Sequence, residues 1–351
     1  MNGDLARRKN IFIKKSVWIE KRVKVLLMVS ISVIIPAHDE EENIGHALKA
    51  YLNGSVLPDE LIVVNDGSTD KTQAIVERIL GQEKNGKAIK LIDFKEGHSA
   101  AFSRNRGAEN AKSEIIVFTD ADVYPEKNFI EKIGIEIDKS EKEKGEFICA
   151  GYYWNLEKPK TLVERVYAAR YAYIFKTKAR KEPDFTGMPY IWKREKFLEI
   201  GKFNENIFYY EDAEIKERLE KKNWKMEKIE AYIYSRNPAT FSELIRQGSY
   251  MGKGVASNAG KILRRNWADL LYPLSPPFWL VFFFSIIASF FFNPLAIFVF
   301  ILLAIILLEL LRHILYSKMI FESFLWVFIF SPIRGFYVIV SFLKNLAKER
   351  V

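Results

Sequence analysis

Short apolar runs separated by longer stretches of mixed polarity recur over the first third of the chain. The runs predict four strands, at residues 31–35, 61–64, 89–92 and 115–119. The stretches between them have the length of helices, and the acidic turn at 40–42 suits the positive end of a helix dipole. Strands that alternate with helices predict a parallel sheet with crossover helices and a ligand crevice at the carboxyl ends of the strands.

A much longer apolar region lies towards the C-terminal end. No charged residue occurs between positions 278 and 308, and Asn293-Pro294 is the only break in the region. These features predict two membrane helices, at about 274–292 and 295–311, joined by a tight turn. The alternative is a consecutive pair of buried helices in a soluble protein, which is uncommon at this degree of apolarity.

Basic residues outside the two expected spans set their orientation. They are Arg264 and Arg265 before the first span, and Arg312, His313 and Lys318 after the second. Because basic residues favour the cytoplasmic side of a membrane, both outer ends are expected there. We therefore expect a multi-pass membrane protein whose preceding body faces the cytoplasm.

A third apolar stretch, at 321–343, is interrupted by Glu322, Pro332 and Arg334. It either spans the membrane or lies at the interface with the Arg334 side chain snorkelling to the headgroups. The basic tail at 344–351 slightly favours the interfacial placement, because a third span would export that tail.

Charge separates the 351-residue chain into three parts. Residues 1–27 hold eight basic and two acidic residues, residues 28–263 hold 37 and 38, and residues 264–351 hold eight and four. The near-neutral body lacks the basic surface of a nucleic-acid binder, whereas the basic ends favour anionic lipid. The leader has no apolar core of a cleavable signal peptide, and a start at Met28 would leave the body complete.

Candidate metal ligands follow the fourth expected strand. The one cysteine, Cys149, excludes an internal disulfide and a thiolate metal site, so oxygen or imidazole must hold any metal. Asp120-Ala121-Asp122 places alternate carboxylates at the strand end, which suits Mg²⁺ or Mn²⁺ that also bridges phosphates. A capping or turn role is the plain alternative.

A polar run, Asn65-Asp66-Gly67-Ser68-Thr69-Asp70, ends the second expected strand. A turn in which Asp70 caps the next helix explains the run structurally. Its place in the same crevice also offers Asp66 to a nucleotide base or ribose. Both roles can hold together.

Five motifs in this order resemble the family 2 glycosyltransferases of the GT-A fold. They are Ser32-Val33-Ile34-Ile35-Pro36-Ala37-His38-Asp39-Glu40, the run at 63–70, Ser103-Arg104-Asn105-Arg106-Gly107, Asp120-Ala121-Asp122, and an acceptor half with Gly187, 200–205 and Glu211-Asp212-Ala213-Glu214. The resemblance covers roughly residues 30–255. It implies an α/β nucleotide-diphospho-sugar transferase fold with a Rossmann-like mixed sheet, here followed by C-terminal transmembrane helices.

The resemblance also implies residue roles. Asp212 would be the catalytic base with Glu211 beside it, although either carboxylate could simply cap a helix. Asp122 and Asp120 would hold the metal, and Gly187 would mark the acceptor region. The implied donor-binding residues are Pro36, Ala37, Asp39, Glu40, Asp66, Arg104, Asp120, Arg246 and Lys253. The last two could instead meet lipid headgroups.

The chain departs from the family pattern at a few positions. Asp39 stands where the family often has Asn, and Asn65 replaces the first of its usual Asp pair. A Gln-x-x-Arg-Trp motif is missing, which disfavours a polysaccharide synthase. Val123-Tyr124-Pro125-Glu126 differs from the Leu-Gln-His-Pro run of dolichyl-phosphate mannose synthases.

The patterns together predict a membrane-anchored inverting glycosyltransferase that moves a sugar from a nucleotide-diphosphate sugar to a lipid-linked or saccharide acceptor. A polyprenyl-phosphate sugar synthase and a non-enzymatic nucleotide-sugar binding scaffold are the alternatives. The expected parts are a basic leader at 1–27, a catalytic domain at 28–255, an interface linker at 256–273, a membrane region at 274–343 and a basic tail at 344–351.

Overall fold

The computed structural model describes residues 29–82, 89–156, 158–169, 188–207, 211–236, 238–246 and 248–249, with scattered positions between 306 and 340. The chain divides into two compact units. The first comprises Met1–Asn155, Phe185–Glu205 and Glu211–Ser235, and the second comprises Leu156–Asp184, Asn206–Tyr210 and Arg236–Val351.

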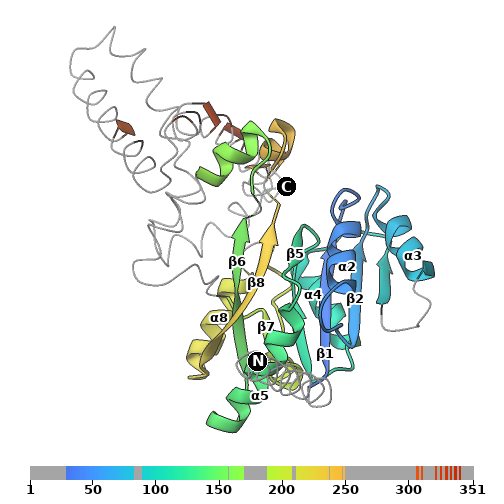
Figure 1. Ribbon diagram of the computed structural model, residues 1–351, viewed down its shortest axis with the longest axis vertical. Helices are drawn as coiled ribbons and strands as arrows, with labels where there is room; N and C mark the ends of the chain where they lie inside the picture. Colours follow the sequence, from blue (N-terminus) through green and yellow to red (C-terminus); the bar gives the residue numbers. More distant parts are fainter. Residues whose placement is uncertain are drawn as a thin grey trace, which may run out of the picture. The chain divides into compact units, whose positions relative to one another are not determined.

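A single sheet of eight strands forms the centre of the first unit (Figure 1). Its strands are β1 (Ile31–Ala37), β2 (Glu60–Asp66), β3 (Ile89–Phe94), β4 (Ile115–Phe118), β5 (Val123–Pro125), β6 (Cys149–Leu156), β7 (Ile191–Lys193) and β8 (Met226–Ser235). They lie in the order β3-β2-β1-β4-β7-β6-β8-β5. The first four positions in this order hold the four strands that the apolar runs predict.

The sheet is mixed. β1 pairs in parallel with β2 and β4, and β2 pairs in parallel with β3. β7 runs antiparallel to both β4 and β6, and β5 runs antiparallel to β8. The predicted parallel arrangement is therefore confirmed for one half of the sheet only, because β7 and β5 pair antiparallel with their neighbours in the other half.

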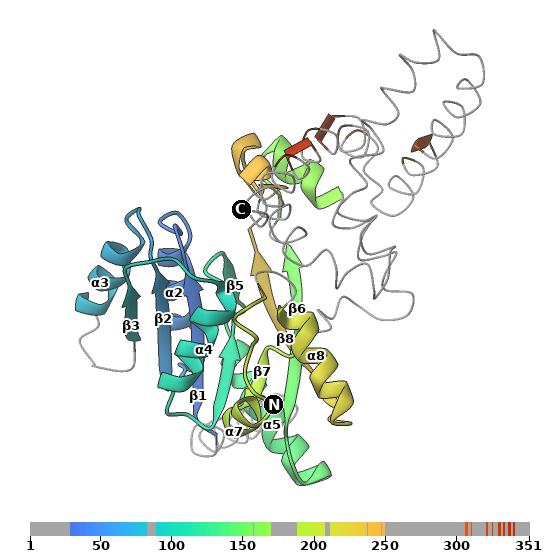
Figure 2. The same cartoon turned by 180° about the vertical axis from the view of Figure 1, so that it is seen from behind.

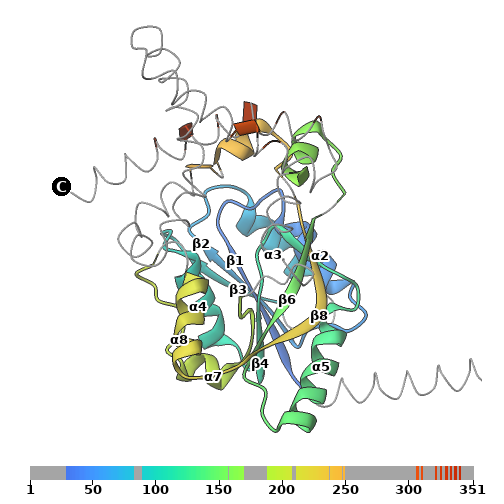
Figure 3. The same ribbon diagram turned by 90° about the vertical axis from the view of Figure 1, so that its left-hand side faces the viewer.

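Helices cover both faces of this sheet. They are α2 (Ile44–Leu52), α3 (Thr72–Gln82), α4 (Ala100–Asn110), α5 (Phe129–Lys144), α7 (Arg194–Glu199) and α8 (Glu211–Lys221). Figure 3 shows α4, α7 and α8 on one side of the sheet and α2 and α5 on the other, and Figure 2 looks onto the side of α4 and α8. The strands β1, β2 and β4, which lie between these layers, bury both their faces.

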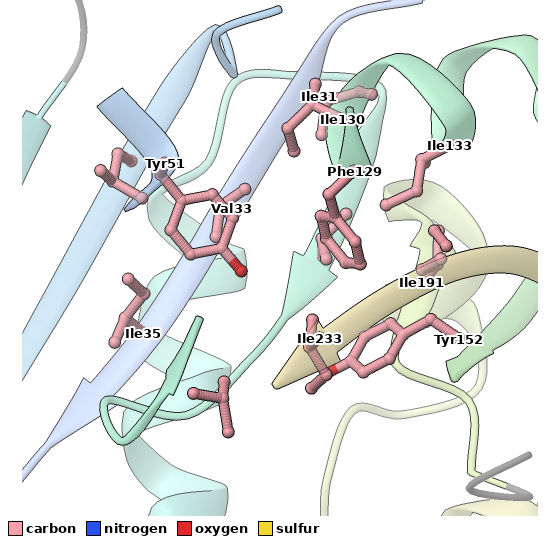
Figure 4. Close-up of a cluster of buried hydrophobic side chains, with 14 of the residues drawn as sticks. Ile31, Val33, Ile35, Tyr51, Phe129, Ile130, Ile133, Tyr152, Ile191 and Ile233 are labelled. Carbon is pink, nitrogen blue, oxygen red and sulfur yellow. The ribbon is translucent and has the colours of Figure 1, made fainter. Parts of the chain in front are cut away.

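The side chains of β1 explain why its sequence is apolar without alternation. Val33 and Ile35 belong to the core cluster that Tyr51 of α2 and Phe129 of α5 complete (Figure 4). Ile34, between them, points to the opposite cluster under α4, α7 and α8. All three strand residues are fully buried, so a polar side chain at any of them would lose its hydration.

The second unit is described at fewer positions. Thr161 and Glu164 form a capping box: the Thr161 hydroxyl accepts from the Glu164 amide at 3.1 Å, and the Glu164 carboxylate accepts from the Thr161 amide at 2.7 Å. Val166, Leu244, Ile306 and Phe330 are buried together. This unit also leaves several large apolar side chains more than a third exposed: Leu162, Phe241, Leu307, Phe321, Ile329 and Phe336.

Much of the sequence-based organisation falls on residues that the structure does not describe. The basic leader and the interface linker lie outside the described residues, as do nearly all of the expected spans at 274–292 and 295–311. Within the described part of the chain, no helix combines the length and apolarity needed to cross a membrane. The membrane spans therefore stay a prediction.

Candidate functional site

The loop after β4 carries the two carboxylates predicted to bind a metal. The side chain of Asp120 is 33% exposed, and Asp122 is half-buried. Burial, together with the negative charges of Asp120 and Glu40, raises the pKa of Asp122 to about 7. Because Glu40 follows β1, the carboxyl ends of two adjacent parallel strands contribute acidic groups to the same place.

The chemistry of this acidic group fits a divalent cation that also touches a substrate. Carboxylate oxygens suit Mg²⁺ or Mn²⁺, and an added positive charge would relieve the repulsion that raises the pKa of Asp122. Among the described residues, no cluster of three or more His, Cys, Asp or Glu side chains is arranged to enclose an ion. The two aspartates would therefore need further oxygen ligands, which a diphosphate and water can supply.

Arg104 connects this acidic loop to α8. Its guanidinium donates from Nη2 to Asp120 Oδ1 at 2.7 Å and from Nη1 to Glu211 Oε1 at 2.6 Å. Burial disfavours the charged guanidinium, but the carboxylates of Asp120 and Glu211 outweigh that effect and raise the pKa of Arg104. The resemblance implies that Arg104 binds the nucleotide-sugar donor. In the structure its guanidinium instead donates hydrogen bonds to two carboxylates of the protein.

The start of α8 holds the predicted base. Burial raises the pKa of both Glu211 and Asp212 from their ordinary values, while Arg104 opposes the shift in each. Glu211 is tied to Arg104, whereas Asp212 accepts a bond from the Ala213 amide at 2.7 Å. Within the described chain no side chain donates to Asp212, so of these two carboxylates Asp212 is the one available for a substrate proton.

The loops after β1 and β2 are joined by side-chain to backbone bonds. Asp39 adopts a φ of 54°, a left-handed conformation that Asp and Asn tolerate better than most residues. Its Oδ1 accepts from the Thr69 amide at 2.7 Å, and its own amide donates to Ser68 Oγ at 3.0 Å. The family preference for Asn where this chain has Asp39 thus has a backbone explanation.

Asp66 lies at the end of β2, where the sequence places a nucleotide contact. It is 6% exposed, and its carboxylate accepts from the His98 amide at 3.1 Å and from the His98 ring at 2.9 Å. Gly67 has a φ of 68°, and a Cβ there would lie 2.5 Å from the Gly97 amide nitrogen. This close approach brings the segment before α4 against β2, and so explains why glycine occupies position 67.

His98 contacts α4 as well as Asp66. Its ring stacks on Phe102 at 4.0 Å with an interplanar angle of 11°. Ser99, the next residue, is the N-cap of α4, since its side chain accepts from the Phe102 amide at 3.2 Å. The N-cap of α4 is therefore Ser99, and His98 lies directly before it.

Tyr190 is a site residue that sequence reasoning missed. Its ring stacks on Tyr152 at 5.2 Å, and Tyr152 donates its hydroxyl to the Phe118 carbonyl at 2.9 Å. Burial and the negative charges of Asp212 and Asp120 raise the pKa of the Tyr190 hydroxyl. A tyrosine directly before a short strand carries no sequence signal for this position, because only the β4 to β7 pairing brings it near the carboxylates.

The other predicted donor and acceptor residues divide into two groups. Pro36 and Ala37 lie in β1 opposite Val64 and Asn65, so they reach the carboxyl edge of the sheet. Gly187 and Lys253 lie outside the described residues, and Arg246 belongs to the second unit. For these three residues the proposed roles stay predictions.

Comparisons with known proteins find sequences similar to part of this chain. Residues 32–201 match the family described as Glycosyl transferase family 2. An uncharacterized glycosyltransferase of Haemophilus influenzae is 33% identical over 105 residues, covering 30% of this chain and 41% of that protein. A 4,4'-diaponeurosporenoate glycosyltransferase of Staphylococcus aureus is 36% identical over 109 residues, covering 30% of this chain and 26% of that protein. The chain thus spans less than half the length of these relatives.

A solved structure extends the likeness in fold. The mannosyltransferase PcManGT from Pyrobaculum calidifontis, in complex with GDP-Man and Mn²⁺, is 16% identical with a TM-score of 0.55, covering 92% of this chain and 88% of that chain. The mixed α/β sheet accordingly resembles the GT-A fold. Residues 32–201 are thus similar to the glycosyl transferase family 2 domain.

Proposed function

We propose that this protein transfers a sugar from a nucleotide-diphosphate sugar to an acceptor hydroxyl or phosphate, with inversion at the anomeric carbon. The observation that carries the proposal is that Arg104 binds some of the neighbouring carboxylates and leaves Asp212 without a side-chain donor among the described residues. Glu211 is held by Arg104, Asp212 is not, and Arg104 also holds Asp120 beside Asp122. One available base thus lies near a pair of metal-type ligands.

The donor would bind at the carboxyl ends of β1, β2 and β4. Asp120 and Asp122 would hold Mg²⁺ or Mn²⁺, which neutralises the charge of the diphosphate as it leaves. Asp66 and the loop that contains Asp39 would contact the nucleoside. The likeness in fold to PcManGT, a mannosyltransferase solved in complex with GDP-Man and Mn²⁺, supports a metal-bound nucleotide sugar.

Asp212 would accept the proton of the acceptor nucleophile. Burial raises its pKa, which brings its proton affinity closer to that needed by a base working near neutral pH. A single base suits direct displacement, in which the acceptor oxygen bonds to the anomeric carbon as the diphosphate departs. The reaction then needs no covalent sugar intermediate on the protein.

The acceptor is proposed to be membrane-confined or carried on a lipid. The support is the long uncharged region at 278–308 and the exposed apolar side chains of the second unit, such as Phe321 and Phe336, which are 61% and 49% exposed. The basic residues that flank this region support a multi-pass anchor whose catalytic domain faces the cytoplasm. A polyprenyl-phosphate sugar synthase would use the same site with a lipid phosphate as acceptor.

A donor screen tests this function. The purified chain is mixed with UDP-glucose, UDP-N-acetylglucosamine or GDP-mannose, with Mn²⁺ or EDTA, and release of nucleoside diphosphate is measured with and without a lipid extract. We expect one donor to be used only with metal, and a radiolabelled product in the lipid phase. Donor binding without any turnover by the wild type would favour the scaffold alternative and overturn the enzyme.

A further inference from the structure

Helix α4 packs closely against β1, and this contact fixes the positions of the helix's side chains. A Cβ on Gly107 would lie 2.2 Å from Ile34 Cγ2, so the absence of a side chain lets the helix contact the strand directly. The Ser99 cap fixes the other end of the helix. Residues 104 and 105 project from a helix that has little freedom to shift against the sheet.

Asn105 holds the chain that leads towards α8. Its side chain accepts from the Phe203 amide at 3.0 Å and donates to the Phe203 carbonyl at 2.9 Å, so it binds both polar groups of one backbone residue. The backbone just before is unusual, because Gly201 and Lys202 both have positive φ, at 93° and 59°. A buried amide pair of this kind fixes the position of an irregular segment.

Arg104, the residue before Asn105, contacts α8 directly. Its side chain is 9% exposed and contacts carboxylates from two elements, Asp120 after β4 and Glu211 at the first position of α8. A planar guanidinium can donate to two carboxylates in fixed directions, which an ammonium group cannot do. Removal of this cation would leave Asp120 and the largely buried Glu211 without their shared partner.

We propose that Arg104 is a positioning residue that holds the start of α8, and with it Asp212, in register with the metal-binding loop. The inference rests on the proposed function for its catalytic consequence, because it concerns the placing of the proposed base. In this proposal Arg104 connects α8 to the metal-binding loop and does not bind the donor. Asn105 and Gly107 support the same connection from the same helix.

Hydrogen exchange of the free chain tests the structural part without any substrate. Peptides that cover α8 should exchange at least about tenfold faster in Arg104→Gln than in the wild type, because local opening becomes easier. Arg106→Gln is the matched control: Arg106 lies on the same helix but pairs with Glu109 and Glu205. Unchanged α8 exchange in Arg104→Gln, or an equal change in Arg106→Gln, would overturn the proposal.

Kinetics separate positioning from donor binding. With the donor that the wild type uses best, Arg104→Gln should lower the rate of nucleoside diphosphate release about tenfold or more, because a displaced base loses rate. Mn²⁺-dependent affinity for the same nucleoside diphosphate should change less than about threefold, since Asp120 and Asp122 remain. Loss of affinity by the same factor as the rate would make Arg104 a donor contact and overturn the inference.

Two further variants guard against a misfolded protein. Arg104→Lys keeps the charge, and its α8 exchange and rate should fall between those of the wild type and Arg104→Gln. Glu211→Gln should reproduce most of the effect of Arg104→Gln, and the double variant should be no worse than the more affected single variant. Additive losses, or wild-type behaviour of Arg104→Lys, would contradict the proposal. If no nucleotide sugar is used by the wild type, the function fails while the exchange experiment still decides the role of Arg104.

Discussion

The parallel and antiparallel halves of the sheet supply the site in different ways. In the parallel half, β1, β2 and β4 end at one edge, where Asp66 is the last residue of β2 and Glu40 and Asp122 lie in the loops after β1 and β4. In the other half, Tyr190 lies directly before β7, and Asp212 lies in the first turn of α8. One half uses a general property of parallel strands, whereas the other depends on contacts particular to this chain.

Helix α4 is the element that joins the two halves. Arg104, Asn105 and Gly107 lie close together in sequence, yet they contact α8 and the β4 loop, the segment at Phe203, and β1, respectively. A motif without any nucleophile or metal ligand can thus be required for the geometry of a site. Substitutions in one half, in the other half and in the connecting helix should therefore have separable effects.

The largest effect is expected at Asp122, in the parallel half. Asp122→Asn removes one of two proposed metal ligands while keeping the side-chain size, so Mn²⁺-dependent binding and turnover should both be lost. Calorimetry with Mn²⁺ and a nucleoside diphosphate measures the first and donor turnover the second. Unchanged metal-dependent binding would remove this aspartate from the site.

Asp122→Asn should lose activity but gain stability at alkaline pH. The pKa of Asp122 in the folded chain is about 7, above its ordinary value, so the folded state binds a proton more tightly than the unfolded state. The stability contributed by this group is therefore greatest below the ordinary carboxyl pKa and is lost as the pH rises towards 7. Without metal, Asp122→Asn should melt a few °C above the wild type at pH 8, with the difference vanishing near pH 4. A pH-independent difference would contradict this interpretation.

Asp212→Asn acts on the other half of the sheet. It keeps the size of the side chain and removes the proton acceptor, so turnover should fall by roughly 10²-fold or more with donor affinity nearly unchanged. Glu211→Gln changes the residue next to Asp212 but keeps the proposed base, so it should lower turnover only about tenfold. Near-normal turnover by Asp212→Asn at saturating donor and acceptor would rule out the assigned base.

Gly107→Ala tests the seat of the connecting helix. The new methyl group would meet Ile34 at 2.2 Å, and overpacking of this kind typically costs about 1–3 kcal/mol. We expect a melting temperature several °C lower, measured by circular dichroism. Gly81→Ala in α3 is the control, because a Cβ there meets no atom within 4 Å and alanine favours a helix, so that variant should be neutral or slightly more stable.

The smallest effect is expected for Tyr190→Phe. The stack on Tyr152 is kept and only the hydroxyl beside Asp212 and Asp120 is removed. Turnover should change by about threefold to tenfold if the hydroxyl orients the acceptor, with melting temperature unchanged. Tyr190→Ala should lower stability as well, since it also removes the stacked ring. A change in stability without any change in turnover for Tyr190→Phe would limit the residue to a packing role.

The parallel half of the fold and the residues at its edge can be predicted from the sequence alone. The four apolar runs match β1, β2, β3 and β4, and β1, β2 and β4 are apolar because both their faces are buried, a requirement that acts locally. Asp120, Asp122 and Asp66 can be predicted for a related reason, since each lies within three residues of the end of such a run. The expected membrane helices rest on sequence alone, because nearly all of them lie outside the described residues.

The use of these residues depends on contacts that only the folded chain makes. Arg104 bridges Asp120 and Glu211, and His98 engages Asp66, which are contacts between residues far apart in sequence. The charges of Asp212 and Asp120 also raise the pKa of the Tyr190 hydroxyl. No period or motif encodes such pairs, because they depend on strand order, on the return of β7 beside β4 and on the close approach that Gly107 permits. The physical reason is that charge and hydrogen bonding act at distances of a few ångströms in space, whereas sequence patterns report only neighbours along the chain.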